Sequence, residues 1–187
     1  MNTNDLIYSN LESLLFQHAS ADAKIVLAYS GGVDSEVLAY CLSIFAKKHK
    51  YFSYLLVHVN HSLSPNSDSW VKHCLERAKL YDLPIAVESI SINKRPRSSI
   101  EELARDARYK AIFKHLDFNS VLLTAHHEDD QLESVLLALK RGSGSQGLAG
   151  ISQASFVDNN LLLRPFLSIN KKHLSTFAAE NNIIHVV

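Results

Sequence analysis

The architecture of this chain can be built outward from Ile25-Val26-Leu27-Ala28-Tyr29-Ser30-Gly31-Gly32-Val33-Asp34-Ser35. The apolar run that opens this stretch is typical of a buried strand, and the residues after the glycines have helical apolar spacing. Gly31 and Gly32 allow a tight turn, and the N–H groups at a helix start face an anion. We interpret residues 30–35 as a phosphate-binding loop whose two serines add hydroxyl donors. The alternative is a plain strand-to-helix turn, because the Walker and dinucleotide glycine patterns are absent.

Short apolar runs alternate with longer segments of helical periodicity along the whole chain. The runs occupy 25–29, 54–59, 85–90 and 121–125, with 161–163 and 183–184 as a fifth and a sixth strand. Helices are predicted at 34–49, 67–82, 99–116, 128–141 and 170–181, after an N-terminal helix within 1–20. Near-continuous apolar strands are buried on both faces. The order therefore predicts an α/β fold with an open doubly wound, mainly parallel sheet flanked by helices.

The composition is that of an ordinary soluble domain. Of the 187 residues, 47% are hydrophobic and 20% are charged, and the formal net charge is zero. There is therefore no global basic field, and nucleic-acid binding would need a local patch. Cys41 and Cys74 form no disulfide or metal-binding spacing, which indicates a reducing compartment. Without a signal sequence or an apolar run near the ~20 residues of a bilayer span, we expect a cytoplasmic protein with no membrane partner.

Acidic residues follow two of the predicted strands, at the sheet edge where ligands bind in such folds. Asp34 lies beside the phosphate loop, where a carboxylate needs a cation between itself and the phosphates, and Mg²⁺ prefers oxygen ligands. Asp130 and Glu133 lie one turn apart in an acidic helix start, pointing away from an apolar face that we expect to pack on the core. That face consists of Leu132, Val135, Leu136 and Leu139. The alternative is that the acids only favour the helix dipole.

Polar and basic residues supply candidate contacts to a nucleotide or to RNA. Asn60 and His61 end the second predicted strand on the ligand side, where either could contact a base or a ribose. Arg105 and Arg108 belong to the stretch 94–114, which has seven basic and three acidic residues. Arg141 opens a glycine-rich loop. The alternatives are structural polar residues, a solvated helix face with Glu–Arg pairs, and an ordinary flexible connection.

Together these motifs resemble the tRNA(Ile)-lysidine synthetase family of N-type ATP pyrophosphatases. The glycine loop alone is specific only to the PP-loop superfamily, whereas the ordered set is highly specific and covers about residues 24–187. The set consists of Ser30–Ser35, His58-Val59-Asn60-His61, Ser99-Ile100-Glu101-Glu102, Ala104-Arg105, Arg108-Tyr109, Ala125–Glu133, Arg141–Gly144, Gly147–Gly150 and Leu163-Arg164-Pro165. The departures are small: Ser134 stands where Thr is usual, and Ser64 where Arg is common.

The resemblance implies a Rossmann-like, adenine nucleotide alpha hydrolase-like fold, with 21–187 as the catalytic domain and the family's C-terminal tRNA-binding domains absent. It also implies ligation of L-lysine to the cytidine at the first anticodon position of tRNA(Ile), through an adenylated tRNA. By the same resemblance, Asp34, Asp130 and Glu133 are catalytic, and Mg²⁺ is held by Asp34 and Asp130. The ATP-binding residues would be Ser30, Gly31, Gly32, Val33, Asp34, Ser35, Asn60 and His61, and the tRNA or phosphate contacts Arg105, Arg108 and Arg141.

Other functions remain open at this point. A tRNA thiolase usually needs paired reactive cysteines, whereas Cys41 and Cys74 fall on predicted core faces. A glutamine-dependent synthetase would need a nucleophilic Cys in an amidotransferase domain. A non-catalytic adenine-nucleotide-binding module would not need Asp130 and Glu133 near the phosphate site. The sequence also leaves a monomer and a homodimer as alternatives.

Overall fold

The computed structural model describes residues 3–60, 66–90, 100–144 and 149–186. The helices are α1 (Thr3–His18), α2 (Val33–Lys48), α3 (Ser67–Tyr81), α4 (Ile100–Phe113), α5 (Glu128–Lys140) and α7 (Lys171–Glu180). The strands are β1 (Lys24–Ala28), β2 (Ser53–Asn60), β3 (Ile85–Ser89), β4 (Ser120–Leu123), β5 (Ala154–Val157) and β6 (Asn160–Leu163).

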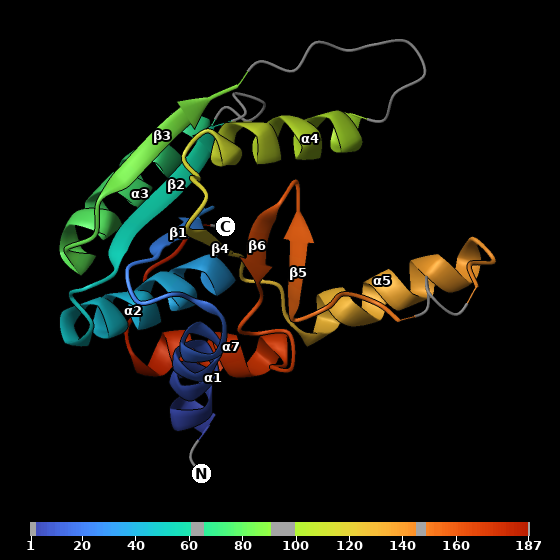
Figure 1. Ribbon diagram of the computed structural model, residues 1–187, viewed down its shortest axis with the longest axis horizontal. Helices are drawn as coiled ribbons and strands as arrows, with labels where there is room; N and C mark the ends of the chain where they lie inside the picture. The colour runs from blue at the N-terminus through green and yellow to red at the C-terminus, as the bar shows by residue number, and fades with distance from the viewer. Residues whose placement is uncertain (1–2, 61–65, 91–99, 145–148, 187) are drawn as a thin grey trace.

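The strands form one sheet in the order β3-β2-β1-β4-β6-β5. All neighbours are parallel except β5, which pairs with β6 in the antiparallel direction. Helices flank this twisted sheet (Figure 1), which confirms the predicted open, mainly parallel α/β architecture. β1 has β2 on one side and β4 on the other, so the order in which successive strands are added to the sheet reverses at β1. In such sheets a ligand crevice opens at this point, beyond the carboxyl ends of the strands.

The side chains of β1 alternate between two hydrophobic clusters, one on each face of the sheet. Ile25 and Leu27 belong to the larger cluster, which also contains buried residues of α1, α2, α3 and α7. Val26 belongs to the smaller cluster, where it meets Ile112 of α4. This alternation follows from the two-residue period of a strand. Helices on both faces explain why the strand sequences are apolar without interruption.

Two predictions about strands differ from the structure. Residues 183–184 form no strand: Ile183 is buried, Ile184 is exposed, and the N–H of Val186 donates to the carbonyl of Gly31 at 3.0 Å. The sheet instead gains β5, which the sequence did not reveal. β5 is a four-residue edge strand whose Phe156 is exposed, so it lacks the apolar run of a buried strand. It reaches β6 through a tight turn with positive φ at Asp158 and Asn159.

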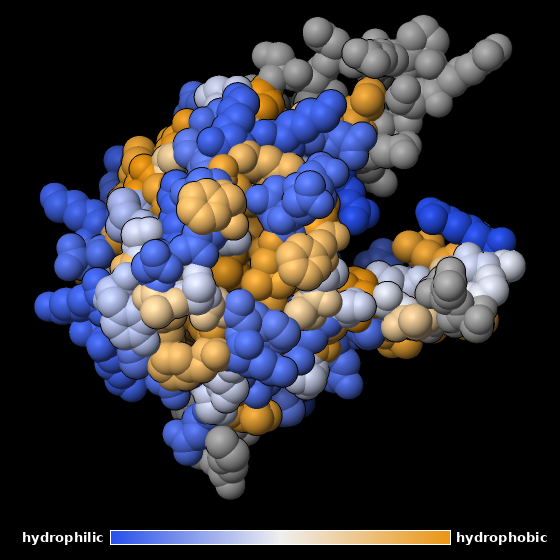
Figure 2. Space-filling model, in the orientation of Figure 1, coloured by the Kyte–Doolittle hydropathy of each residue, from blue (hydrophilic) through white to orange (hydrophobic). Residues whose placement is uncertain are grey.

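The expected packing of α5 was wrong. Leu132, Leu136 and Leu139, which we expected on a core face, are 60%, 55% and 56% exposed. The helix contains no buried residue and projects away from the sheet in Figure 1. Figure 2 shows apolar side chains among polar ones along this projection. The periodicity predicted the helix correctly, but not what the helix packs against.

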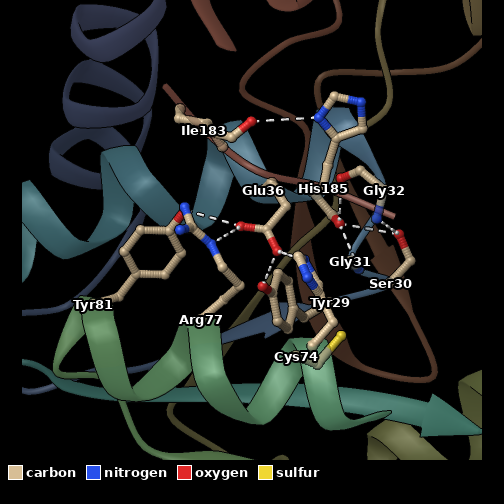
Figure 3. A network of polar contacts seen from close by, with 12 residues as sticks. Tyr29, Ser30, Gly31, Gly32, Glu36, Cys74, Arg77, Tyr81, Ile183 and His185 are labelled. Atoms are coloured by element: carbon tan, nitrogen blue, oxygen red, sulfur yellow. Dashed lines mark hydrogen bonds and ion pairs between the residues drawn. The ribbon is translucent and has the colours of Figure 1, made fainter. Parts of the chain in front are cut away.

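A buried carboxylate joins α2 to α3 one turn beyond the glycine loop (Figure 3). The side chain of Glu36 is fully buried, and its Oε1 accepts a hydrogen bond from the Tyr29 hydroxyl and lies 2.9 Å from His73 Nε2. Its Oε2 accepts from Arg77 Nε at 3.3 Å and from the Tyr81 hydroxyl at 2.9 Å. Removing one partner of such a pair would leave an uncompensated buried charge, so the network ties α3 to the start of α2.

Candidate functional site

Two adjoining cavities lie at the carboxyl ends of the strands. The larger, of about 780 Å³, is bordered by the ends of β1 and β2, by the segment after β4 and by α4. It is lined by eight of the residues that we expected at a ligand site: Ser30, Gly32, Asp34, Ser35, Asn60, Arg105, Arg108 and Asp130. These residues come from the loop after β1 and from α2, β2, α4 and α5, which the sheet order brings together.

The glycine loop is held closed by its own serines. Ser35 Oγ accepts a hydrogen bond from the N–H of Gly31 at 3.0 Å and donates to the carbonyl of Gly32 at 3.0 Å. Ser30 Oγ accepts a weaker bond from the N–H of Gly32 at 3.4 Å. The two hydroxyls, which we expected to face a ligand, therefore also shape the loop. Gly32 is the N-cap of α2 and has no side-chain cap. The first N–H groups of α2 consequently have no intrahelical acceptor and suit an anion.

Gly31 and Gly32 have different roles. Gly31 has φ = +84°, and a Cβ there would lie 2.9 Å from Cys74 Sγ and 3.3 Å from Val186 Cγ2. Gly32 has φ = −70°, and a Cβ there would meet only Ser30 Oγ at 3.6 Å. Gly31 therefore packs behind the loop and does not line the larger cavity. Val33 does not line it either, because its side chain packs against the core.

This difference gives a stability prediction. Gly31→Ala should lower the free energy of unfolding by about 1–3 kcal/mol, because alanine is strained at this φ and its Cβ meets a buried sulfur. The free energy of unfolding of the matched variant Gly32→Ala should stay within about 1 kcal/mol of that of the original chain. A small loss of N-cap stabilisation is opposed by the lower conformational entropy of the unfolded chain. Urea denaturation followed by far-UV circular dichroism measures both. Equal losses would contradict the assignment of separate roles.

Asp34 is a partly buried carboxylate with an unsatisfied oxygen. Its Oδ1 is buried and has no hydrogen-bond partner among the described residues. Its pKa is raised, chiefly by burial, although the nearby charges of His127 and Lys171 act in the opposite direction. A buried, partnerless carboxylate oxygen fits a hard cation, and Mg²⁺ often takes only one or two protein carboxylates and finds its other ligands in water and phosphate.

His127 lies between the two carboxylates expected to bind the metal. Its Nε2 is 3.6 Å from Asp34 Oδ2, and its Nδ1 is 3.4 Å from Asp130 Oδ2. Asp130 Oδ2 also accepts a hydrogen bond from the N–H of His127 at 2.8 Å, so it helps to cap α5. Within the described residues, no group of three or more His, Cys, Asp or Glu side chains is arranged to hold a metal ion. Of these two carboxylates, Asp34 is the better candidate for a metal ligand, because Asp130 Oδ2 already accepts a hydrogen bond from a backbone N–H.

The smaller cavity has a volume of about 310 Å³ and lies between α4, the first turns of α5 and the residue after β6. It is lined mainly by Arg105, Tyr109, His126, Asp130, Glu133 and Arg164, with Ser134, Leu137 and Ile151. Asp130 and Arg105 line both cavities, whereas Glu133 lines only the smaller one. Although Asp130 and Glu133 lie one turn apart in the sequence, Asp130 therefore borders both cavities and Glu133 borders only the smaller one.

The remaining candidate contacts are dispersed. Arg108 lines the larger cavity, but Arg141 is exposed at the C-cap of α5 and lines neither. His61 and the basic stretch 94–97 lie outside the described residues, as does Ser99 of the expected capping box. The structure therefore brings Arg105 and Arg108 to the site and leaves Arg141 about one helix length away, at the far end of α5.

Sequence reasoning gave no role to three side chains that the structure places at the site. Arg164 lines the smaller cavity, His126 lines both cavities, and His127 lies between Asp34 and Asp130. His126 Nδ1 is 2.8 Å from Thr124 Oγ1, and burial together with the charge of Arg164 lowers the pKa of His126. Arg164 could have been found from its position, because it directly follows a buried apolar run at the ligand edge of the sheet.

A family model described as a PP-loop domain matches residues 5–187. The tRNA(Ile)-lysidine synthase of Shewanella oneidensis is 51% identical over 181 residues, covering 94% of this chain and 38% of the relative. That of Shewanella woodyi is 50% identical over 186 residues, covering 99% and 39%. That of Histophilus somni is 42% identical over 172 residues, covering 92% and 40%. This chain therefore spans about two fifths of the length of these curated relatives.

Solved structures share the fold at low sequence identity. The U34-tRNA thiolase of Methanococcus maripaludis, solved with its [4Fe-4S] cluster, aligns with a TM-score of 0.74 at 16% identity, covering 98% of this chain and 64% of that chain. The NH3-dependent NAD synthetase of Campylobacter jejuni aligns with a TM-score of 0.63 at 16% identity, covering 98% and 75%. At these identities the likeness concerns the fold alone. In the described part of the chain, none of the helices combines the length and apolar character that a bilayer span requires.

Proposed function

This chain belongs to the PP-loop domain family, and on that premise we propose that it is the catalytic part of a tRNA(Ile)-lysidine synthase. It would act in the cytoplasm as a carbon–nitrogen ligase on tRNA(Ile), with ATP and L-lysine as the other substrates, and residues 21–187 would form its catalytic domain. The observation that carries the proposal is that Asp130 lines both cavities. A nucleotide site and a site for a second, cationic substrate would then share one wall.

The proposed reaction has two steps. In the first, the ring carbonyl oxygen of the cytidine at the first anticodon position attacks the α-phosphorus of ATP. The bond between the α- and β-phosphates breaks, and pyrophosphate leaves. In the second, the amine of lysine forms a carbon–nitrogen bond at the activated ring carbon. The carbon–oxygen bond to AMP breaks, the amine loses a proton, and AMP leaves.

The residues of the larger cavity suit the first step. The start of α2 and the glycine loop would hold the phosphates, because the helix dipole and the N–H groups of its first turn favour negative charge. We assign Asn60 and His61 to the nucleoside, and Arg105 and Arg108 to phosphate or to the tRNA backbone. Arg141, at the exposed end of α5, would contact tRNA outside the cavities.

Mg²⁺ is part of the proposal, with Asp34 as its main protein ligand and Asp130 as the second. Asp34 has an oxygen without a partner in the described part of the chain, whereas Asp130 is partly engaged by the N–H of His127. Bound there, Mg²⁺ would neutralise charge on the leaving pyrophosphate. Glu133, and in part Asp130, would attract the lysine ammonium and orient the amine for attack.

A tRNA thiolase is the second candidate, because one such enzyme shares the fold. The cysteines of this chain do not favour it. Cys41 and Cys74 are both buried, and burial raises the pKa of each thiol to about 12. A thiolate nucleophile or cluster ligand requires the opposite environment, with a lowered pKa and access to solvent. The residues therefore favour the lysine ligase.

The proposal predicts a specific pattern of substrate dependence. We expect pyrophosphate release from the purified protein to need ATP and tRNA(Ile) but not lysine, and AMP release to need all three. The measurement is release of both products with each substrate omitted in turn. Pyrophosphate release without tRNA, or AMP release without lysine, would contradict the ligase. A bare nucleotide-binding module would release neither product.

A further inference from the structure

The smaller cavity contains a guanidinium whose charge is not balanced within the described structure. Arg164 is only 9% exposed, and its Nη1 donates to the carbonyl of Ser152 at 2.6 Å and to Ser155 Oγ at 2.9 Å. Both acceptors are neutral. Among the described residues its buried Nε has no hydrogen-bond partner, and no carboxylate lies within ion-pair distance of the guanidinium. A buried cation without a counter-charge is costly, so this position fits an anionic ligand.

A second arginine adds positive charge to the lining of this cavity. Arg105 lines the same cavity, and its charge, after the larger effect of burial, lowers the pKa of Arg164. His126 lines the same cavity, and burial together with the charge of Arg164 lowers its pKa. The lining of the cavity therefore contains two arginines, and arginine offers planar hydrogen-bond donors to carboxylates.

The lining of the same cavity also contains two acidic residues, both from α5. Asp130 and Glu133 reach it from the first turns of α5, and Glu133 forms no ion pair with any described residue. A cavity lined by both arginines and carboxylates suits a zwitterion. A phosphate bound there would gain from Arg164 but would be repelled by the two acids.

The volume of the smaller cavity also agrees with a small zwitterionic ligand. Its volume of about 310 Å³ lies at the lower end of the range of roughly 300–1,000 Å³ for small-molecule sites, while the neighbouring cavity of about 780 Å³ has room for a nucleotide. An amino acid is therefore a better occupant of the smaller cavity than a nucleotide.

We propose that Arg164 binds the α-carboxylate of the amino-acid substrate, opposite the ammonium held by Asp130 and Glu133. This inference rests on the proposed function, since it takes lysine as the second substrate. It makes Arg164 a specificity residue: the site would select a free amino acid and discriminate against amines of the same length that lack a carboxylate.

The experiment compares three amines as second substrate: L-lysine, L-lysinamide and 1,5-diaminopentane. The readout is AMP release from pre-adenylated tRNA(Ile). We expect the original protein to prefer lysine in kcat/KM by roughly 10- to 100-fold over both analogues, which is the usual worth of a hydrogen-bonded charge contact. Arg164→Met should remove this preference, because kcat/KM should fall for lysine and change little for the two analogues. Arg164→Lys should restore part of it.

The controls separate recognition from folding. Ser155→Ala removes one neutral anchor of Arg164 but leaves the guanidinium in place, so the preference for lysine should persist. Pyrophosphate release in the first step should be unchanged in Arg164→Met. Loss of that step would mean that Arg164 binds a phosphate, and equal use of lysine and lysinamide by the original protein would mean that no carboxylate is recognised. Either result overturns the inference, and the comparison of lysine with lysinamide needs only the original protein. Absence of lysine-dependent AMP release from the original protein would instead overturn the proposed function itself.

Discussion

Asp34→Asn should reduce pyrophosphate release with ATP and tRNA(Ile) on the order of 100- to 1,000-fold, the loss typical of removing one preorganised electrostatic contact. The change preserves the shape of the side chain but removes the charge that the partnerless Oδ1 would offer to a cation. The folded protein should not lose stability. Burial raises the pKa of Asp34, which means that the charged form is disfavoured in the folded state, so a neutral amide relieves that cost at pH 7.

The matched control is Asp129→Asn. Asp129 lies in the first turn of α5, is exposed and lines neither cavity. Its replacement should leave pyrophosphate release within about twofold, because exposed charges contribute little. Product release and the thermal unfolding midpoint should be measured for both variants. If Asp34→Asn retained full activity, Asp34 would be only an acidic residue in a helix start.

Glu36→Gln should lower the free energy of unfolding by about 3–5 kcal/mol, a large share of the total stability of a typical domain. Glu36 is fully buried, and Arg77, its partner, is 9% exposed. The amide keeps the size of the side chain but leaves the guanidinium of Arg77 without a counter-charge. Urea denaturation followed by circular dichroism measures the loss.

The control for this prediction is another Glu→Gln change in an ion pair. Glu76 pairs with Lys72 at 3.9 Å on the surface of α3, where both side chains are well exposed. Glu76→Gln should cost less than about 1 kcal/mol. The double variant Glu36→Gln with Arg77→Met should recover part of the loss, because no unpaired charge remains buried. A cost for Glu36→Gln no larger than that for Glu76→Gln would disprove the role of the network.

Local patterns predicted most of the secondary structure. The apolar runs placed β1, β2, β3, β4 and β6, and the 3.6-residue period placed α2, α3, α4, α5 and α7, each within three residues at either end. These signals are local, because a strand or helix is encoded by neighbours in the sequence. β5 was missed because a short, half-exposed edge strand carries no such run. The prediction of a strand at residues 183–184 was wrong because Ile183 is buried without pairing in the sheet, and Ile184 is exposed.

The sequence by itself therefore determined the class of the fold, the glycine loop with Asp34 after β1, and the acidic start of α5 after β4. The tertiary structure alone decided which of these groups meet. It placed His127 between Asp34 and Asp130, brought Arg164 and Glu133 to the same cavity, and left the apolar side of α5 exposed. The physical reason is that these contacts join residues far apart in the chain. They depend on the order in which β1, β4 and β6 pair and on where each strand ends, and no periodicity within a single segment encodes that order.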